Sequence, residues 1–170
     1  MKVYSNLMGN NSKINASEIA HKDSSNNIYT LEKILNVNNS YANASYIGSA
    51  ISGSDSAFSS FDTFSSNGNL TPTSSGITIG AGIRYVMVSG GMLLQNTVAS
   101  YNLAYCGITK NSVQIEQFYT ELRNSNGVQG FISLPTTIIP VKKGDIIAIF
   151  GNGDSRTNIR RAYLNVKAVG

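Results

Sequence analysis

The sequence has no tryptophan, a single cysteine, three prolines and few charged residues. With Cys106 as the only cysteine, an intrachain disulfide is excluded, so packing and hydrogen bonds must hold the fold together. Cys106 lies in an apolar run and is expected to be a small buried side chain. Charged residues make up 13% of the chain, against about 25% in ordinary soluble proteins. The polar surface is therefore built mainly from Asn, Ser, Thr and Gln, or additional surface is buried in an assembly.

Long apolar runs are also missing. A membrane-spanning helix needs about 18 or more consecutive apolar residues, and no such run occurs, so we expect no membrane insertion. No basic stretch followed by an apolar segment opens the chain, so we expect no signal peptide. These features predict a protein that is made in the cytoplasm and leaves the cell only as part of something larger.

Residues that could support catalysis or metal binding are sparse. The single histidine, His21, has no acidic partner at a definable spacing, and one His with one Cys falls short of a zinc site. The motifs H-E-x-x-H, C-x-x-C and G-x-S-x-G are absent. Asp154 supplies one carboxylate, whereas calcium takes about six to eight oxygens. We expect no catalytic residue, no metal and no cofactor, although paired carboxylates for glycan cleavage stay open on sequence grounds.

Positive charge is concentrated in the second half of the chain. Residues 1–70 carry four Lys and five acidic residues, whereas residues 71–170 carry nine Lys or Arg and four acidic residues. A nucleic-acid site would need these cations on one face, with aromatic side chains for stacking. The simpler interpretation is a solvated or subunit-pairing set, and we expect no nucleic-acid partner. The excess is carried chiefly by Lys142, Lys143, Arg156, Arg160, Arg161 and Lys167.

The first 38 residues predict an extended arm that ends in one short helix. The helix is expected over residues 28–38, with Thr30 as its cap and Glu32 near its positive end. Isolated helices below about 12–15 residues are marginal, so this one needs a partner, either its own domain or copies of itself around an axis. Its apolar stripe consists of Ile28, Leu31, Ile34 and Leu35.

The rest of the chain divides by composition into two parts. Residues 39–75 are rich in Ser and Asn and are expected to form a connector or the first strands. Residues 76–170 contain many short apolar runs separated by turns, which is typical of a sandwich or barrel. One of these strands is expected to end at Gly90-Gly91. The fold class is therefore predicted to be all-β, an antiparallel jelly-roll sandwich preceded by the arm.

The segment 141–150 is the most informative part of this pattern. Gly144 is expected to adopt a positive φ in a turn, and the side chain of Asp145 can hydrogen-bond the local backbone. In the strand that follows, Ile147 and Ile149 point to one side, while Ile146, Ala148 and Phe150 point to the other. Neither face of this strand is expected to meet water.

The order of these elements resembles that of a known fold family. Residues 82–89 resemble the "G-x-x-Y-x-V-x-x" strand of the tumour necrosis factor/complement-like jelly roll. Residues 141–147 resemble its "V-x-x-G-D-x-I" turn, and residues 162–166 its final strand. The resemblance covers about residues 76–170 and implies a homotrimer. The residues expected to form the trimer core or to be critical for folding are Tyr85, Val86, Val88, Gly144, Asp145, Ile147, Ile149, Leu164 and Val166.

Residues 13–23, with the short helix after them, resemble the opening of small phage virion proteins, in which an arm precedes a trimeric β-structured head. The resemblance implies a non-enzymatic virion protein that binds other virion proteins through its arm. It would serve as a head fibre, a capsid decoration or a tail fibre, and the sequence leaves capsid and tail open. The expected anchoring residues are Ile14, Ile19, Ile28, Leu31, Ile34 and Leu35.

Three other functions fit the sequence less well. A receptor-binding module recognising host cell-surface glycan is the main alternative, although the nine tyrosines fit a sandwich core at least as well as a sugar site. A secreted signalling ligand of the same fold is disfavoured because no signal peptide or membrane anchor is expected. A glycan depolymerase lacks any visible catalytic constellation.

Overall fold

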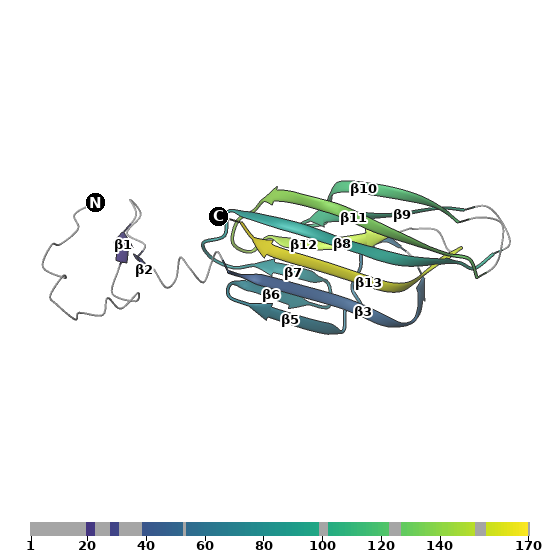
Figure 1. Cartoon of the computed structure of the whole chain (residues 1–170), viewed down its shortest axis with the longest axis horizontal. Helices are drawn as coiled ribbons and strands as arrows, with labels where there is room; N and C mark the ends of the chain where they lie inside the picture. Colours follow the sequence, from purple (N-terminus) through teal and green to yellow (C-terminus); the bar gives the residue numbers. More distant parts are fainter. Residues whose placement is uncertain are drawn as a thin grey trace, which may run out of the picture.

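The structure, a computed structural model, describes residues 20–22, 28–30, 39–52, 54–98, 102–122, 127–151 and 156–169. Two antiparallel sheets pack face to face as a sandwich (Figure 1). The five-stranded sheet has the order β11 (Gln129–Pro140), β8 (Tyr85–Asn96), β13 (Thr157–Ala168), β3 (Tyr41–Ser52) and β5 (Thr63–Asn67). The six-stranded sheet has the order β10 (Val113–Leu122), β9 (Asn102–Lys110), β12 (Ile146–Gly151), β7 (Gly76–Ile79) and β6 (Leu70–Thr73), and β4 (Ser54–Ala57) also pairs with β12. The predicted all-β jelly-roll sandwich is confirmed.

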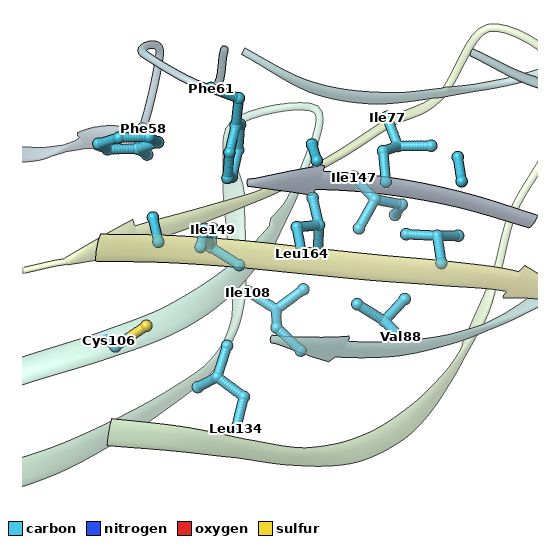
Figure 2. Close-up of a cluster of buried hydrophobic side chains, with 14 of the residues drawn as sticks. Phe58, Phe61, Ile77, Val88, Cys106, Ile108, Leu134, Ile147, Ile149 and Leu164 are labelled. Atoms are coloured by element: carbon cyan, nitrogen blue, oxygen red, sulfur yellow. The ribbon is translucent and has the colours of Figure 1, made fainter. Parts of the chain in front are cut away.

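The core lies between the two sheets. Val88 and Leu164 enter it from the five-stranded sheet, and Ile108, Ile147 and Ile149 enter it from the six-stranded sheet (Figure 2). All five side chains are fully buried. Burying a side chain of this size stabilises the folded state by about 1.5–3 kcal/mol, so the sandwich is held mainly by this layer.

The strand predicted to be apolar on both faces is largely as expected. Ile147 and Ile149 face the core, and Ala148 and Phe150 are also buried although they point to the opposite side of the sheet. Ile146 departs from the expectation because 41% of its side chain is exposed. It is the first residue of β12, where the sheet ends and few neighbours can cover it.

The helix predicted to begin at Ile28 is corrected by the structure. Ile28–Thr30 forms strand β2, which pairs in antiparallel fashion with β1 (Ala20–Lys22) in a separate two-stranded sheet. The sequence Ile-Tyr-Thr is β-branched and aromatic, which favours extended backbone, and a short helix has little stability of its own. The remainder of the predicted helix, residues 31–38, lies outside the described residues.

The segment 39–75 contains the first strands of the sandwich. β3 is an interior strand that pairs with β13 on one side and with β5 on the other. The inward-facing residues Ala42 and Ala44 are small, so the sequence carries only a weak apolar signal here. Phe58 and Phe61 are buried with ring centroids 4.9 Å apart. Within the described ranges, no helix is long and apolar enough to cross a membrane.

Two turns at one end of the sandwich fix the strands that flank them. Gly144, between β11 and β12, has a φ of 89°, which is the positive value that the sequence predicts. The β9–β10 hairpin has a two-residue turn in which Asn111 and Ser112 both have positive φ, as the tight type I′ turn requires. The two turns are joined because the Asn111 backbone N–H donates to the Ile146 carbonyl at 2.9 Å.

Candidate functional site

The outward surface of the five-stranded sheet exposes several large apolar side chains. We call this surface the outer face and define it by the residues of β11, β8, β13 and β3 that point away from the core. Monomeric soluble proteins rarely expose a contiguous apolar patch of more than a few hundred Å², and larger patches mark interaction sites. Its most exposed large side chains are Tyr41, Ile47, Tyr85, Phe131 and Ile138.

The register of the strands arranges these side chains in bands across the sheet. One band, near the end where β8 begins, crosses Ile138, Met87, Lys167 and Tyr41 in adjacent strands. Tyr85 lies beside it, at the start of β8. This band is apolar except for Lys167, so most of its surface offers no hydrogen bonds to water.

A second band lies towards the other end of the same strands. It crosses Phe131, Leu93, Arg161 and Ile47. Tyr163, in the neighbouring row, stacks on Phe131 with ring centroids 5.8 Å apart and an interplanar angle of 7°. The stacked pair forms a flat, partly exposed aromatic surface.

A polar row separates the two apolar bands. It consists of Ser89, Asn165 and Asn43 on adjacent strands. Asn43 Nδ2 donates to Ser65 Oγ of β5 at 3.0 Å. The charged side chains in the three rows are Lys167 and Arg161, and both are cationic. A surface of aromatic and aliphatic side chains with uncharged amides between them resembles the core of a subunit interface, where charged residues are depleted.

The glycine pair expected to end a strand lies in the middle of one. β8 continues through Gly90 and Gly91 as far as Asn96. A Cβ at Gly91 would lie 2.9 Å from the Tyr163 ring, so glycine allows that ring to lie across the strand. A Cβ at Gly90 would lie 2.8 Å from the Tyr163 carbonyl oxygen. The expected strand end at these residues is therefore wrong, because both glycines serve close packing rather than a turn.

The residues predicted for the trimer core fall into three places. Six of them lie inside the sandwich of a single chain: Val86, Val88, Ile147, Ile149, Leu164 and Val166. Tyr85 is exposed at the edge of the outer face. Gly144 and Asp145 form the turn between β11 and β12.

Of the expected anchoring residues, Ile28 is in β2. The others, Ile14, Ile19, Leu31, Ile34 and Leu35, lie outside the described residues.

Asp145 is buried and acts as the hub of its turn. Its Oδ1 accepts a hydrogen bond from Asn111 Nδ2 at 2.8 Å, and its Oδ2 accepts one from the Lys142 backbone N–H at 3.0 Å. The Asn111 side chain also accepts a hydrogen bond from the Ile146 N–H at 2.9 Å. The Asn111 contact is the main cause that lowers the pKa of Asp145, and burial opposes it. The carboxylate therefore joins two turns while it stays ionised.

The other side chains that could take part in catalysis or metal binding are also engaged in the fold. Burial raises the pKa of the Cys106 thiol to about 12, so the thiol stays protonated at neutral pH. Glu116 Oε2 accepts a hydrogen bond from Thr137 Oγ1 at 2.7 Å, which links the two sheets along one edge. In the described part of the chain, no three His, Cys, Asp or Glu side chains gather as a metal site would need.

Comparison with known proteins identifies the fold. The chain is similar in structure to Eiger TNF from S. frugiperda, with a TM-score of 0.53 and 9% identity over 77% of this chain and 94% of that one. It is also similar to PRD1 vertex protein P5, with a TM-score of 0.50 and 18% identity over 78% of this chain and 98% of that one. No protein-family model and no curated protein matches the sequence. At these identities the likeness establishes the jelly-roll fold alone.

Proposed function

We propose that this chain is a non-enzymatic structural protein of a phage virion. In this proposal the sandwich assembles as a homotrimer through the outer face, and the arm of residues 1–38 attaches it to another virion protein. The trimer would serve as a head fibre or capsid decoration, or as a tail fibre. The outer face is the observation that carries the proposal, because it gives a monomer a surface that water solvates poorly.

The chemistry of the outer face favours copies of the same chain as its partner. Closed cyclic assemblies are the usual way in which identical subunits cover such patches. The two apolar bands would supply the buried contacts, and the Ser89, Asn165 and Asn43 row would supply hydrogen bonds that set the register. The family resembled by residues 76–170 implies a threefold arrangement, which supports a trimer over a dimer.

Three observations support a place in a virion. One of the similar structures is a phage vertex protein. The segment 13–23 resembles the opening of small phage virion proteins. The low charge content of the chain agrees with extensive burial in an assembly. A non-enzymatic role is supported by the uses already found for Cys106, Glu116 and Asp145, each of which is buried in or bonded within the sandwich.

The first experiment tests the trimer with two matched variants. Ile138 on the outer face and Val113 on the other sheet are both β-branched, and they are 63% and 68% exposed. Light scattering should give three times the 18.2 kDa chain mass for the wild type and for Val113→Asp. Ile138→Asp should shift the chain towards monomer at micromolar concentration. A monomeric wild type, or a trimer that tolerates Ile138→Asp, contradicts the proposal.

The second experiment tests the location. Mass spectrometry and electron microscopy of purified particles from the phage that encodes the chain should find it as a surface component. Glycan-array binding by the purified trimer, in the absence of any particle association, would favour the receptor-binding alternative. Either result separates the two functions without depending on the oligomeric state.

A further inference from the structure

The end of the sandwich at which the chain enters is distinctly basic. We call it the entry end and define it as residues 39–40, 80–84, 110–112 and 141–145. Its cationic side chains are Arg84, Lys110, Lys142 and Lys143. Arg84, Lys142 and Lys143 are exposed and Lys110 is half-buried. The end therefore presents four positive charges on each chain.

Little negative charge offsets these cations. Among the described acidic side chains, Asp145 is the one at the entry end, and it is buried within its turn. Glu116 lies further along β10, where it bonds Thr137, and Asp62 precedes β5. Asp145 interacts electrostatically with Lys110 and Lys142, so the four cations and this one carboxylate leave the entry end with a net positive charge.

Hydrogen bonds between the loops fix the backbone from which the cations project, and one of them also holds the Lys110 side chain. The Val141 N–H donates to the Arg84 carbonyl at 2.8 Å, and the Gly144 N–H donates to the Ile79 carbonyl at 2.8 Å. Lys110 Nζ donates to the Pro140 carbonyl at 3.1 Å. Because the loop backbone is already fixed, binding a complementary surface would have to order only the exposed side chains, which favours recognition at this end.

The entry end also lies where the arm joins the head. Ser40 is fully buried, its Oγ accepts from the Asn69 N–H and its carbonyl accepts from the Ala168 N–H, both at 2.9 Å. Figure 1 shows the start of β3 and the C-terminus at this same end. If the arm is attached to a particle, the entry end is the part of the head that faces that particle.

We propose that the entry end is a second docking surface, which binds an acidic surface on the virion protein that holds the arm. The proposal rests on the proposed function. In a trimer the four cations are repeated three times around one axis, so modest individual attractions add up. Complementary charge of this kind speeds association and fixes orientation, which attachment by the arm alone would not do.

The chemistry of the entry end favours an acidic protein over nucleic acid or membrane. Between the cations lie small residues, Gly80, Ala81, Gly82 and Ser112. Sequence-tolerant binding to single strands uses aromatic platforms, and the exposed aromatic residues next to these loops, Tyr41 and Tyr85, both belong to the outer face. Membrane-surface binding uses a continuous apolar face beside the cations; the exposed apolar residues that border these loops are Val113 and Ile146, at the starts of β10 and β12, and vesicles are therefore included in the test.

The test compares two variants with the same change in net charge. Lys142→Gln/Lys143→Gln and Arg156→Glu each lower the charge by two, but Arg156 immediately precedes β13, at the opposite end of the sandwich. Full-length protein would be co-sedimented with particles that lack it over a range of salt concentrations. Melting temperatures would check that both variants are folded.

The entry-end variant should bind roughly tenfold more weakly than wild type at low salt, and the difference should vanish near 1 M salt, where the Debye length is about 3 Å. Arg156→Glu should stay within about twofold of wild type, since a distant charge is screened. Equal losses in both variants, or in neither, overturn the inference but leave the proposed function standing. Wild-type protein that never sediments with particles overturns both. The inference is also overturned if the Lys142→Gln/Lys143→Gln variant binds particles as well as wild type but binds duplex DNA or anionic phospholipid vesicles more weakly than wild type.

Discussion

The two sheets differ in how far an outward-facing phenylalanine ring is exposed. On the six-stranded sheet, the ring of Phe150 lies over Gly107 and beside Tyr105, with ring centroids 6.0 Å apart, and Phe150 is only 4% exposed. On the five-stranded sheet, Tyr163 lies over Gly91 and stacks on Phe131, yet Phe131 is 51% exposed. The same arrangement, a ring that lies over a glycine, is buried within the chain on one sheet and exposed on the other.

The largest expected effect comes from truncating the two phenylalanines. Phe150→Ala should lower the free energy of unfolding by about 3–5 kcal/mol, because it empties a filled site. Phe131→Ala should lower it by less than about 1 kcal/mol in the monomer, because half of that ring already meets water. Denaturant titration at low protein concentration measures both. Equal losses would break the comparison.

Substituting the glycine beneath each ring should give the same order of stability losses, with the larger loss on the six-stranded sheet. Gly107→Ala would place its methyl carbon well inside van der Waals contact with both the Glu116 carbonyl oxygen and the buried Phe150 ring, so it should cost about 3 kcal/mol, the upper end of the usual range for overpacking. Gly91→Ala would place its methyl carbon 2.5 Å from the Ile132 carbonyl oxygen and 2.9 Å from the Tyr163 ring, which is partly exposed and can tilt towards solvent, so it should also destabilise the fold but by less than Gly107→Ala. Thermal unfolding of the two variants side by side gives the order. A larger loss for Gly91→Ala would show that its backbone contacts decide the outcome.

Substitutions of Gly144, in the turn that connects the two sheets, should destabilise the sandwich as a whole and neither face in particular. Gly144 has a φ of 89°, and a Cβ added there would meet no atom within 4 Å, so Gly144→Val acts through the backbone alone and should cost about 1–3 kcal/mol. Gly144→Asn should cost less, because Asn tolerates this conformation. The folded fraction of Gly144→Val should still form trimers. Loss of trimers at full folding would assign this turn to the interface.

The smallest effect is a pH dependence at Asp145. Its pKa is lower in the folded state than in the unfolded chain, where it is about 3.9. The carboxylate therefore stabilises the fold above about pH 4, and this contribution is lost as the pH falls from there through the folded pKa. Asp145→Asn should flatten that part of the stability curve. Melting temperatures of both proteins between about pH 7 and about pH 2.5 give the readout, and parallel curves would argue against the assignment.

Much of the second half of the fold can be predicted from the sequence. The strand after Gly144 is a continuous apolar run and the final strand through Leu164 alternates between the two faces, and neither signal depends on distant partners. β3 is less visible because its inward residues Ala42 and Ala44 are small and its burial depends on β13, more than 100 residues further along the chain. The continuation of β8 is hidden because Gly90 and Gly91 indicate a turn until the close approach of Tyr163 is known.

The candidate site is harder to predict than the fold. Of the residues predicted for the trimer core, Tyr85 is the one that lies on the outer face. Phe131 and Ile138 lie in a strand whose alternation shifts register between Leu134 and Thr137, so the side each residue faces cannot be counted from one end. The exposure of Ile138 depends on which sheet β11 joins, and pairing between distant strands is not encoded in a local pattern.

The pairing of β3 with β13 also has a mechanical consequence. The chain enters the head at Ser40, and β3 runs lengthwise from there between β13 and β5. Antiparallel hydrogen bonds lie perpendicular to the strands, so a pull on the arm along β3 strains many of them at once instead of opening them one by one. A head attached in this way resists being torn off by shear, and pulling single molecules from the arm should show one high rupture force.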